Sequence, residues 1–200
     1  MPEGLTGLKG AGKSKGTKLV SLDAGFNKPG IYEVELGTSL DIVIDELGGG
    51  YKQPAKALHI GGPLGGIIPI QKTQNLNLDF ESFSENGFLL GHASIVCIPE
   101  SMAMIDYIEH LFQFTAAESC GKCFPCRLGS TRGKEMMSQA KTGHYKIEPQ
   151  LLADLLDTME RGSLCALGSG LPLPITNALT YFQDELAPYF SSRIPSVNIN

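Results

Sequence analysis

Four of the five cysteines form a three-plus-one arrangement in the second half of the chain. Cys120, Cys123 and Cys126 share one seven-residue stretch with two x-x spacings, and Cys165 follows further along. A [4Fe–4S] cluster takes four thiolates, and two x-x spacings let three of them reach successive corners of the cluster from one tight turn. The fourth ligand must come from another loop, as Cys165 could provide. A chain of this kind has to bring two separate loops together.

Two other roles stay open for these thiols. A structural zinc site also uses four thiolates, usually as two separate C-x-x-C pairs. The three-plus-one division favours iron–sulfur over zinc. A thioredoxin-like redox pair is a third reading, but the extra cysteine and the missing βαβ pattern count against it. Cys165 could also be a buried structural thiol. Cys97 lies in a strand-like run and is predicted to pack in a core.

The composition excludes several classes of protein. With 42% hydrophobic and 18% charged residues, the chain can bury a core and is not expected to be disordered. Its formal net charge of −5 argues against nucleic acid as a partner. Five cysteines in 200 residues are too few for a disulfide scaffold. We find neither a signal peptide nor an apolar run of about 18 residues, so no transmembrane segment and a cytoplasmic location are expected.

The local patterns predict an α+β protein. Strand-like runs occupy 18–22, 30–35, 57–60, 67–70 and 94–98, and apolar residues at helical spacing predict a helix over 39–47 that ends at Gly48. Further apolar stripes predict helices around 104–112, 151–159 and 175–186. A fourth helix is predicted over 127–140, directly after the cysteine loop, although Gly129 and Gly133 weaken it.

These elements predict two domains. A small β-grasp-like domain is expected over residues 17–99, followed by a four-helix-bundle domain over 100–190 that binds the [4Fe–4S] cluster. Residues 1–16 are predicted to be a flexible leader and 191–200 a tail. A helix that starts after Cys126 would aim its free N–H groups at the cluster, and Lys122 and Arg127 would add positive charge. Both effects favour the more negative reduced state and so raise the reduction potential.

Other motifs are predicted to carry no chemistry. Residues 7–14 satisfy the P-loop expression, but six residues are too few for the preceding strand, and a strand rather than a helix follows. The glycine-rich stretches 48–50 and 61–66 are interpreted as tight turns. The histidines are scattered and are predicted to be structural or solvated: His59, His92, His110 and His144. No Ser/His/Asp arrangement or carboxylate pair stands out, so no catalytic residue is predicted.

The segments 118–127 and 162–168 resemble the C-terminal part of the NADH-binding, flavin-carrying subunit of respiratory complex I. They also resemble the equivalent subunits of NAD-dependent formate dehydrogenases and NAD-reducing hydrogenases, and 132–135 with 164–172 are closer to the formate dehydrogenase branch. Residues 16–22, 29–37 and 61–66 are similar to the soluble-ligand-binding β-grasp (SLBB) domain of that family. The resemblance spans about 16–190 and implies a [4Fe–4S] cluster held by Cys120, Cys123, Cys126 and Cys165.

The resemblance also implies a function. The chain would be the electron-transfer portion of an NADH-linked oxidoreductase, passing electrons from reduced flavin through the cluster to a partner subunit. The implied partners are a thioredoxin-like [2Fe–2S] subunit, a larger iron–sulfur subunit and the flavin/NADH-binding domain. Nothing before Gly16 resembles that domain, so FMN and NAD are not expected on this chain, nor NADH oxidation by it alone. The location would be cytoplasmic, peripheral to the inner membrane through the complex. The alternative is a non-catalytic module that docks a partner or ligand, with a structural zinc site.

Overall fold

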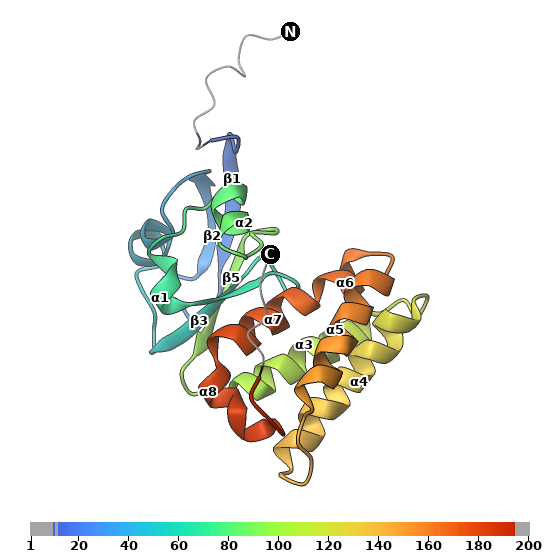
Figure 1. Ribbon diagram of the computed structural model, residues 1–200. Helices are drawn as coiled ribbons and strands as arrows, with labels where there is room; N and C mark the ends of the chain where they lie inside the picture. Colours follow the sequence, from blue (N-terminus) through green and yellow to red (C-terminus); the bar gives the residue numbers. More distant parts are fainter. Residues whose placement is uncertain (1–9, 11, 195–200) are drawn as a thin grey trace. The chain divides into compact units, whose positions relative to one another are not determined.

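A computed structural model describes residue 10 and residues 12–194 (Figure 1). The chain divides into two compact units between Glu100 and Ser101. The first unit is built around a five-stranded sheet, and the second consists of helices and their connecting loops in its described part. The protein therefore combines a mixed sheet with several helices, as the α+β prediction required at this coarse level.

The sheet of the first unit is mixed. Its strands are β1 (Thr17–Leu22), β2 (Gly30–Glu35), β3 (Ala55–Ile60), β4 (Gly66–Pro69) and β5 (Ser94–Pro99). They lie in the order β2-β1-β5-β3-β4; β1 and β5 run parallel, and the other neighbours run antiparallel. All five predicted strands are confirmed, except that Ile70 begins a short helix instead of ending β4.

The burial of the strands follows their position in the sheet. On β1, Val20 and Leu22 are buried while Leu19 is exposed, because successive side chains point to opposite faces. Strand β3, which has β5 on one side and β4 on the other, is buried on both faces from Ala57 to Ile60. These residues form the core on which the first unit's helices rest.

The helix predicted over 39–47 exists, but its last turns are a π-helix, η1 (Ile42–Leu47). The Gly48 N–H donates to the carbonyl of Val43, five residues earlier, at 3.0 Å. A Cβ on Gly48 would lie 2.7 Å from the Phe26 ring, so only glycine allows this close approach. Packing against the core therefore decides a winding that hydrophobic spacing cannot distinguish from an ordinary α-helix.

Two short helices in the first unit were not predicted: α1 (Ile70–Thr73) and α2 (Phe80–Glu85). They are too short to show an apolar period. For α2 a signal was nevertheless present, since the Asp79 carboxylate caps it by accepting from the Ser82 N–H at 2.6 Å.

The P-loop expression lies partly outside the described residues, because 7–9 and 11 are not described. Ser14 is buried, and its hydroxyl donates to the Glu81 carboxylate and accepts from the Phe80 N–H at 3.4 Å. Strand β1 follows at Thr17. Ser14 thus forms hydrogen bonds at the start of α2. A P-loop needs a helix directly after it, and a strand follows here instead.

The second unit contains four longer helices within the described residues: α3 (Met104–Glu118), α4 (Phe124–Lys141), α5 (Pro149–Gly162) and α7 (Pro172–Tyr181). Shorter elements are α6 (Ala166–Gly170), α8 (Gln183–Leu186) and the 3₁₀ turn η2 (Ala187–Tyr189). The apolar stripe of α3 is confirmed, since its predicted members are all buried: Met104, Ile105, Ile108, Leu111 and Phe112. The stripe of α5 is confirmed at Leu152, Leu156 and Met159. Of its other two predicted members, Leu155 is half-buried and Leu151 is exposed. The predicted helix over 175–186 is wrong as a single element, because the backbone breaks at Phe182 (φ −121°, ψ 36°).

Close packing explains the two glycines of α4. Gly133 lies directly against the buried ring of Phe112 on α3, where a Cβ would overlap the ring. A Cβ on Gly129 would lie 2.7 Å from Cγ of Met159 on α5. Both glycines cost helix propensity, but they let α4 approach its two neighbours closely.

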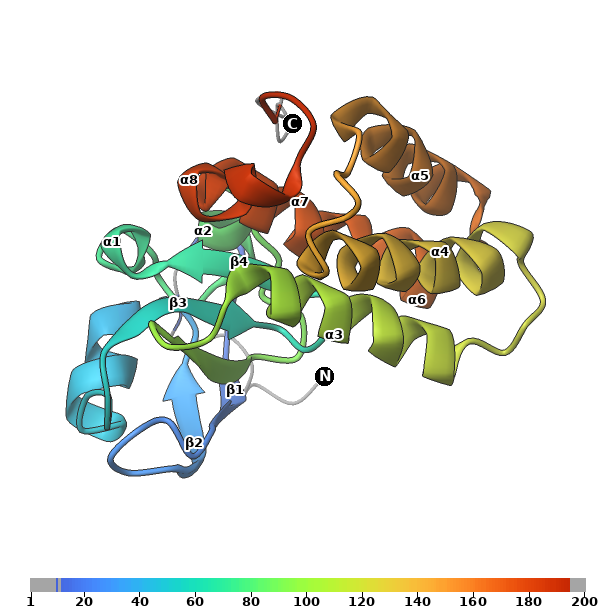
Figure 2. The ribbon, with the colours of Figure 1, turned by 90° about the horizontal axis from the view of Figure 1, so that it is seen from below.

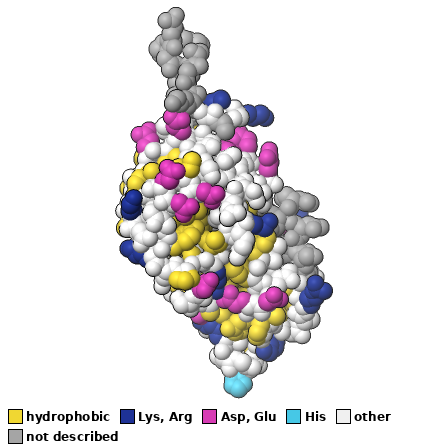
Figure 3. Space-filling view, turned by 90° about the vertical axis from the view of Figure 1, so that its left-hand side faces the viewer, with side chains coloured by type: hydrophobic (Ala, Val, Ile, Leu, Met, Phe, Trp, Pro, Cys, Tyr) yellow, Lys and Arg dark blue, Asp and Glu magenta, His cyan; other side chains and the backbone are white. Residues whose placement is uncertain are grey.

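Charged residues of both signs are interspersed on the side of the molecule shown in Figure 3, with exposed apolar side chains between them. Among the described residues, no helix is long and apolar enough to cross a membrane.

Candidate metal centre

Cys120 and Cys123 lie between α3 and α4, and Cys126 lies in the first turn of α4. The fourth cysteine, Cys165, lies between α5 and α6. Figure 2 shows these two connections at the same end of the helical unit. Cys123 is the N-cap residue of α4, and Cys165 is the N-cap residue of α6. Cys126 is buried, Cys123 is half-buried, and Cys120 and Cys165 are exposed.

Helix α4 begins at Phe124, so the prediction that it starts after Cys126 is wrong by three residues. Pro125 occupies the first turn, where its fixed φ suits a helix and its missing N–H costs no hydrogen bond. The Arg127 N–H already donates to the Cys123 carbonyl at 3.0 Å. Cys126 therefore sits within the first turn, where backbone N–H groups have no acceptor inside the helix.

The second loop lies against the first. The Leu164 N–H donates to Sγ of Cys123 at 3.4 Å. A Cβ on Gly168 would lie 2.8 Å from Cβ of Cys126, and one on Gly162 would lie 2.7 Å from Cγ of Pro125. Glycine at both positions lets the segment that carries Cys165 approach the cysteine loop.

The donor set fits an iron–sulfur cluster. Ser163 Oγ is buried without a hydrogen-bond partner among the described residues, and it flanks Gly168 as Cys126 does. Such a hydroxyl can donate to a sulfide or thiolate. No set of three or more His, Cys, Asp or Glu in the described range is close enough to hold a single metal ion. The thiolates of a [4Fe–4S] cluster bind four different irons, so they need not converge on one point.

Polar groups around the loop favour negative charge. Ser119 Oγ accepts from the Gly121 N–H at 3.3 Å and lies 3.4 Å from Cys126 Sγ, with which it is hydrogen-bonded. The Arg127 guanidinium donates to the Gly121 carbonyl at 3.2 Å and lies over the Phe124 ring. Sequence reasoning found Arg127 but missed Ser119 and Ser163, because no spacing rule links a lone serine to a cluster.

Cys97 is separate from the other four cysteines, in β5 of the first unit. It lies in the predicted strand but is half-buried rather than fully enclosed. Burial raises the pKa of its thiol to about 12, and the carboxylate of Asp23 contributes in the same direction. A Cβ on Gly25 would lie 2.6 Å from Cβ of Cys97, so the side chain fills a tight place.

His59 is the one predicted histidine that the structure buries. It lies on β3 with Nε2 3.3 Å from the Gly65 carbonyl oxygen. Burial lowers the pKa of His59 from 6.5 to about 4, against the opposing effect of the Gly65 carbonyl. His59 is therefore a neutral structural residue at pH 7.

The burial of His59 predicts acid sensitivity. The unfolded chain takes up a proton near pH 6.5 and the folded chain only near pH 4, so stability falls as the pH is lowered through this window. We expect the free energy of unfolding to drop by about 2–3 kcal/mol more between pH 7 and pH 4.5 in the wild type than in His59→Gln. Urea titrations of both proteins measure this difference. Equal pH dependence would contradict the assignment.

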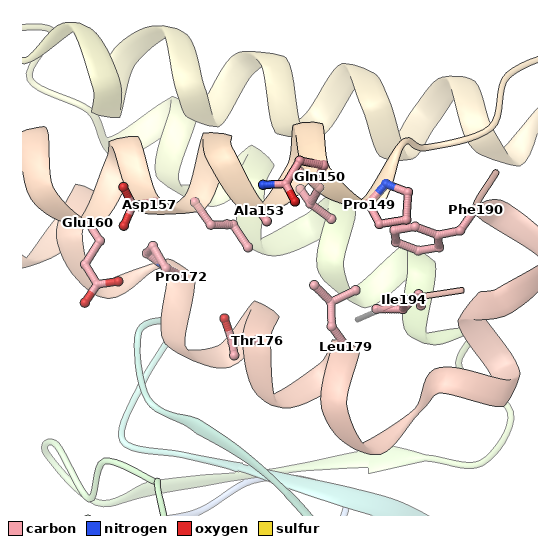
Figure 4. A pocket seen from close by; sticks show the side chains of 12 residues that line it. Pro149, Gln150, Ala153, Asp157, Glu160, Pro172, Thr176, Leu179, Phe190 and Ile194 are labelled. Carbon is pink, nitrogen blue, oxygen red and sulfur yellow. The ribbon is translucent and has the colours of Figure 1, made fainter. Parts of the chain in front are cut away.

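A cavity of about 270 Å³ lies between α5 and α7. Figure 4 shows Asp157 and Glu160 at one end and Phe190 and Ile194 at the other. Its lining is mostly apolar, and it includes none of the four cysteines. It is thus distinct from the candidate metal centre.

Residues 106–189 match the family model of the NADH-ubiquinone oxidoreductase-F iron–sulfur binding region. This match includes Cys120, Cys123, Cys126 and Cys165, and it covers most of the helical unit. The helical unit is similar to this iron–sulfur binding region over most of its length. The matched family model describes a region that binds a [4Fe–4S] cluster, and the cysteine loop of the present chain fits such a cluster.

Several relatives are similar over most of the chain. The NADP-reducing hydrogenase subunit HndC of Solidesulfovibrio fructosivorans is 33% identical over 88% of the chain and 36% of its own length. An NADH-quinone oxidoreductase subunit of Streptomyces coelicolor, also of the F type, is 32% identical over 92% of the chain and 41% of its own length. The mitochondrial NADH-ubiquinone oxidoreductase 51 kDa subunit of Aspergillus niger is 30% identical, and the chain covers 36% of it. The chain thus spans well under half the length of these relatives.

The fold has a counterpart among solved structures. A chain of an NAD⁺-reducing [NiFe]-hydrogenase superposes with a TM-score of 0.80 at 24% identity, covering 95% of this chain and 33% of that one. At this identity the likeness establishes the fold alone. The prediction of a formate dehydrogenase branch stays a prediction.

Proposed function

We propose that this chain is the electron-transfer portion of an NADH-linked oxidoreductase, with Cys120, Cys123, Cys126 and Cys165 as the ligands of a [4Fe–4S] cluster. When bound, the cluster supplies one-electron transfer. The observation that carries this proposal is the hydrogen bond from the Leu164 N–H to Cys123 Sγ, because it brings the fourth cysteine's loop against the other three.

The surrounding residues have defined tasks in this proposal. The first turn of α4 directs unpaired N–H groups and the positive end of the helix dipole toward the thiolates. Ser119 is placed to donate to the Cys126 thiolate once the thiol proton is lost. Lys122 and Arg127 add positive charge, and all these groups favour the more negative reduced state. The protein therefore raises the reduction potential of the centre it holds.

The finer description of the fold belongs to the same proposal. The strand order β2-β1-β5-β3-β4 with a central parallel pair, and a helix directly after the β1–β2 hairpin, support a β-grasp domain over residues 17–99. The succession of α3, α4, α5 and α7, with α4 packed closely against both α3 and α5, supports a four-helix bundle over 100–190. The predicted leader over 1–16 and tail over 191–200 lie mostly outside the described residues.

The partners follow from the kind of complex to which the relatives belong. We propose that the chain works with a flavin/NADH-binding domain as donor, and with a thioredoxin-like [2Fe–2S] subunit and a larger iron–sulfur subunit on the acceptor side. FMN and NAD would bind to that donor domain and not to the residues described here. A cytoplasmic location, peripheral to the inner membrane through the complex, is part of this proposal.

Metal and sulfide analysis of anaerobically purified protein tests the proposal. We expect about four irons and four acid-labile sulfides per chain, with a reversible one-electron signal in electron paramagnetic resonance. One zinc per chain without sulfide would contradict the electron-transfer role. That result would favour the alternative, a partner- or ligand-docking module in which zinc only stabilises the fold of the helical unit.

A further inference from the structure

Strand β2 forms an open edge of the five-stranded sheet. Among the described residues it pairs with β1 on one side and with no strand on the other. The strand at the opposite edge, β4, is different, because all four of its residues are buried. On β2, Ile31 is 72% exposed and Glu33 is exposed as well. The sheet therefore has one covered edge and one edge that is accessible to another chain.

The hydrogen-bond register shows which backbone groups of β2 face the open side. The antiparallel register of β1 and β2 continues to Gly16 and Leu36, where the Leu36 N–H donates to the Gly16 carbonyl at 2.9 Å. Hydrogen-bonded pairs alternate along such a ladder, so they fall at the even-numbered residues. The Ser21 N–H accordingly points to the other side of β1 and donates to a carbonyl beside β5 at 3.3 Å. The N–H and carbonyl groups of Ile31 and Glu33 therefore point away from β1, and they have no other hydrogen bond among the described residues.

Strand β2 lacks most of the features that prevent a sheet edge from pairing. Its six residues pair with β1 without a bulge, and it contains no proline and no lysine. Proteins commonly block an open edge with such features, because unpaired N–H and carbonyl groups are a template for another strand. The charges of Glu33 and Glu35 remain, and they restrict the partner by its charge. An edge of this kind can accept an extended segment of suitable sequence.

The exposed face beside this edge is both apolar and acidic. Ile31, Glu33 and Glu35 share this face, because alternate side chains of a strand point the same way. Leu19 of β1, directly opposite Glu33, is 62% exposed on the same face. The Glu33 carboxylate accepts from the Thr17 hydroxyl at 2.6 Å and forms no ion pair among the described residues. A strand added beside β2 thus meets one apolar and two acidic side chains.

We propose that β2 is the docking edge for an extended segment of a partner protein, which adds a sixth strand to the sheet. The segment pairs with the outward N–H and carbonyl groups of Ile31 and Glu33. It carries an apolar side chain opposite Ile31, and lysine or arginine opposite Glu33 and Glu35. A basic partner is favoured over a second copy of the chain, because two β2 strands would bring four glutamates to one face of the joined sheet. This inference does not depend on the cluster or on the proposed function.

A capped seven-residue peptide, Thr-Lys-Thr-Lys-Thr-Ile-Thr, is the probe. Paired antiparallel to β2, it places its isoleucine opposite Ile31 and its two lysines opposite Glu33 and Glu35. We expect fluorescence polarisation to show saturable binding of the labelled peptide to the full 200-residue chain. The affinity should fall as salt rises, because salt screens the charges. A second peptide with glutamate in place of both lysines should bind about tenfold more weakly.

Two N-methylated forms of the probe test backbone pairing directly. Methyl groups on the N atoms of the isoleucine and of the lysine opposite Glu33 remove donors to β2, and should weaken binding about tenfold or more. Methyl groups on two threonine N atoms, which point away from β2, are the matched control and should leave the affinity unchanged. Amide hydrogen exchange, followed by nuclear magnetic resonance, should slow at Ile31 and Glu33 when the probe binds. Exchange at Tyr32 and Val34 should not change, because their N–H groups face β1.

Two variants test the residues of the edge. Glu33→Gln should weaken binding of the lysine probe about two- to fivefold and reduce its salt dependence. Ile31→Pro removes an outward N–H without breaking the ladder to β1, and should weaken binding about tenfold. Glu160→Gln changes an exposed glutamate on α5 and is the matched control, which should bind as wild type.

The N-methylated probes decide the outcome even if Ile31→Pro fails to fold. Equal affinity of the probe with and without methyl groups on its pairing N atoms would overturn the docking edge. So would equal affinity of the lysine and glutamate probes, or unchanged exchange at Ile31 and Glu33. A wild-type dimer that protects the same two amides would also contradict it, since the edge would then serve a second copy. None of these measurements depends on iron, so the result is separate from the test of the proposed function.

Discussion

Replacing Cys126 by serine is expected to lower the iron and sulfide content of the anaerobically purified chain from about four of each to less than one. Cys126 is buried in the first turn of α4, with its Cβ against Gly168 and its Sγ beside Ser119. A serine there fits the space but offers a far poorer ligand, since the hydroxyl stays protonated at neutral pH. The absorbance and paramagnetic signals of the cluster should disappear with the iron.

The matched control for Cys126→Ser is Cys97→Ser, in the first unit. The thiol of Cys97 is held protonated by burial and by Asp23, with its pKa raised to about 12, so it is unsuited to binding iron. That variant should keep about four irons per chain. Cys165→Ser should resemble Cys126→Ser, although Cys165 is exposed. Full iron in the Cys126 or Cys165 variant would exclude the mutated residue from the ligand set.

Replacing Phe112 by alanine should lower the free energy of unfolding of the helical unit by about 3–5 kcal/mol. The Phe112 ring is fully buried, and it fills the contact between α3 and α4 over Gly133. Its removal leaves a cavity that the helices cannot close without moving. Urea unfolding followed by circular dichroism measures the loss. Leu151→Ala, at an exposed site on α5, should change stability by less than about 1 kcal/mol.

Gly133→Ala tests whether the contact between Gly133 and the Phe112 ring is responsible for this stability. In the wild type this change should destabilise the unit by about 1–3 kcal/mol, because the new methyl group overlaps the Phe112 ring. In the Phe112→Ala background the overlap is gone, and alanine should then stabilise α4 by up to about 1 kcal/mol through its helix propensity. Additive effects of the two changes would show that Gly133 and Phe112 do not interact.

Much of the fold follows from local patterns in the sequence. The alternating runs of β1 and β2 and the apolar stripe of α3 predicted their elements, because each element buries one face and its period shows in the chain. The same patterns failed to predict the structure where contacts between distant parts of the chain, and not the local period of apolar residues, determine the backbone conformation. They missed α6 and the break at Phe182, and they could not distinguish the π-helix η1 from an α-helix.

The candidate metal centre, too, was predictable from the sequence only in part. Two x-x spacings and one distant cysteine pointed to four thiolates, because three ligands on one turn need only local geometry. Nothing local could place Cys165 beside them. That required α5 to return alongside α4, with glycine at 162 and 168 leaving room for the loops to meet. The exposure of Phe124, Leu128 and Leu164 was equally hidden, since it depends on packing that the sequence does not show.

Residue types and their spacing therefore predicted the kind of chemistry, because they limit which metal centre a loop can hold. The tertiary structure alone decided which residues surround that centre. It put Ser119 beside Cys126, aimed the Leu164 N–H at Cys123, and left the apolar side chains next to them in solvent. The physical reason is that ligand identity is a property of individual side chains, whereas their surroundings depend on contacts between helices far apart in the chain.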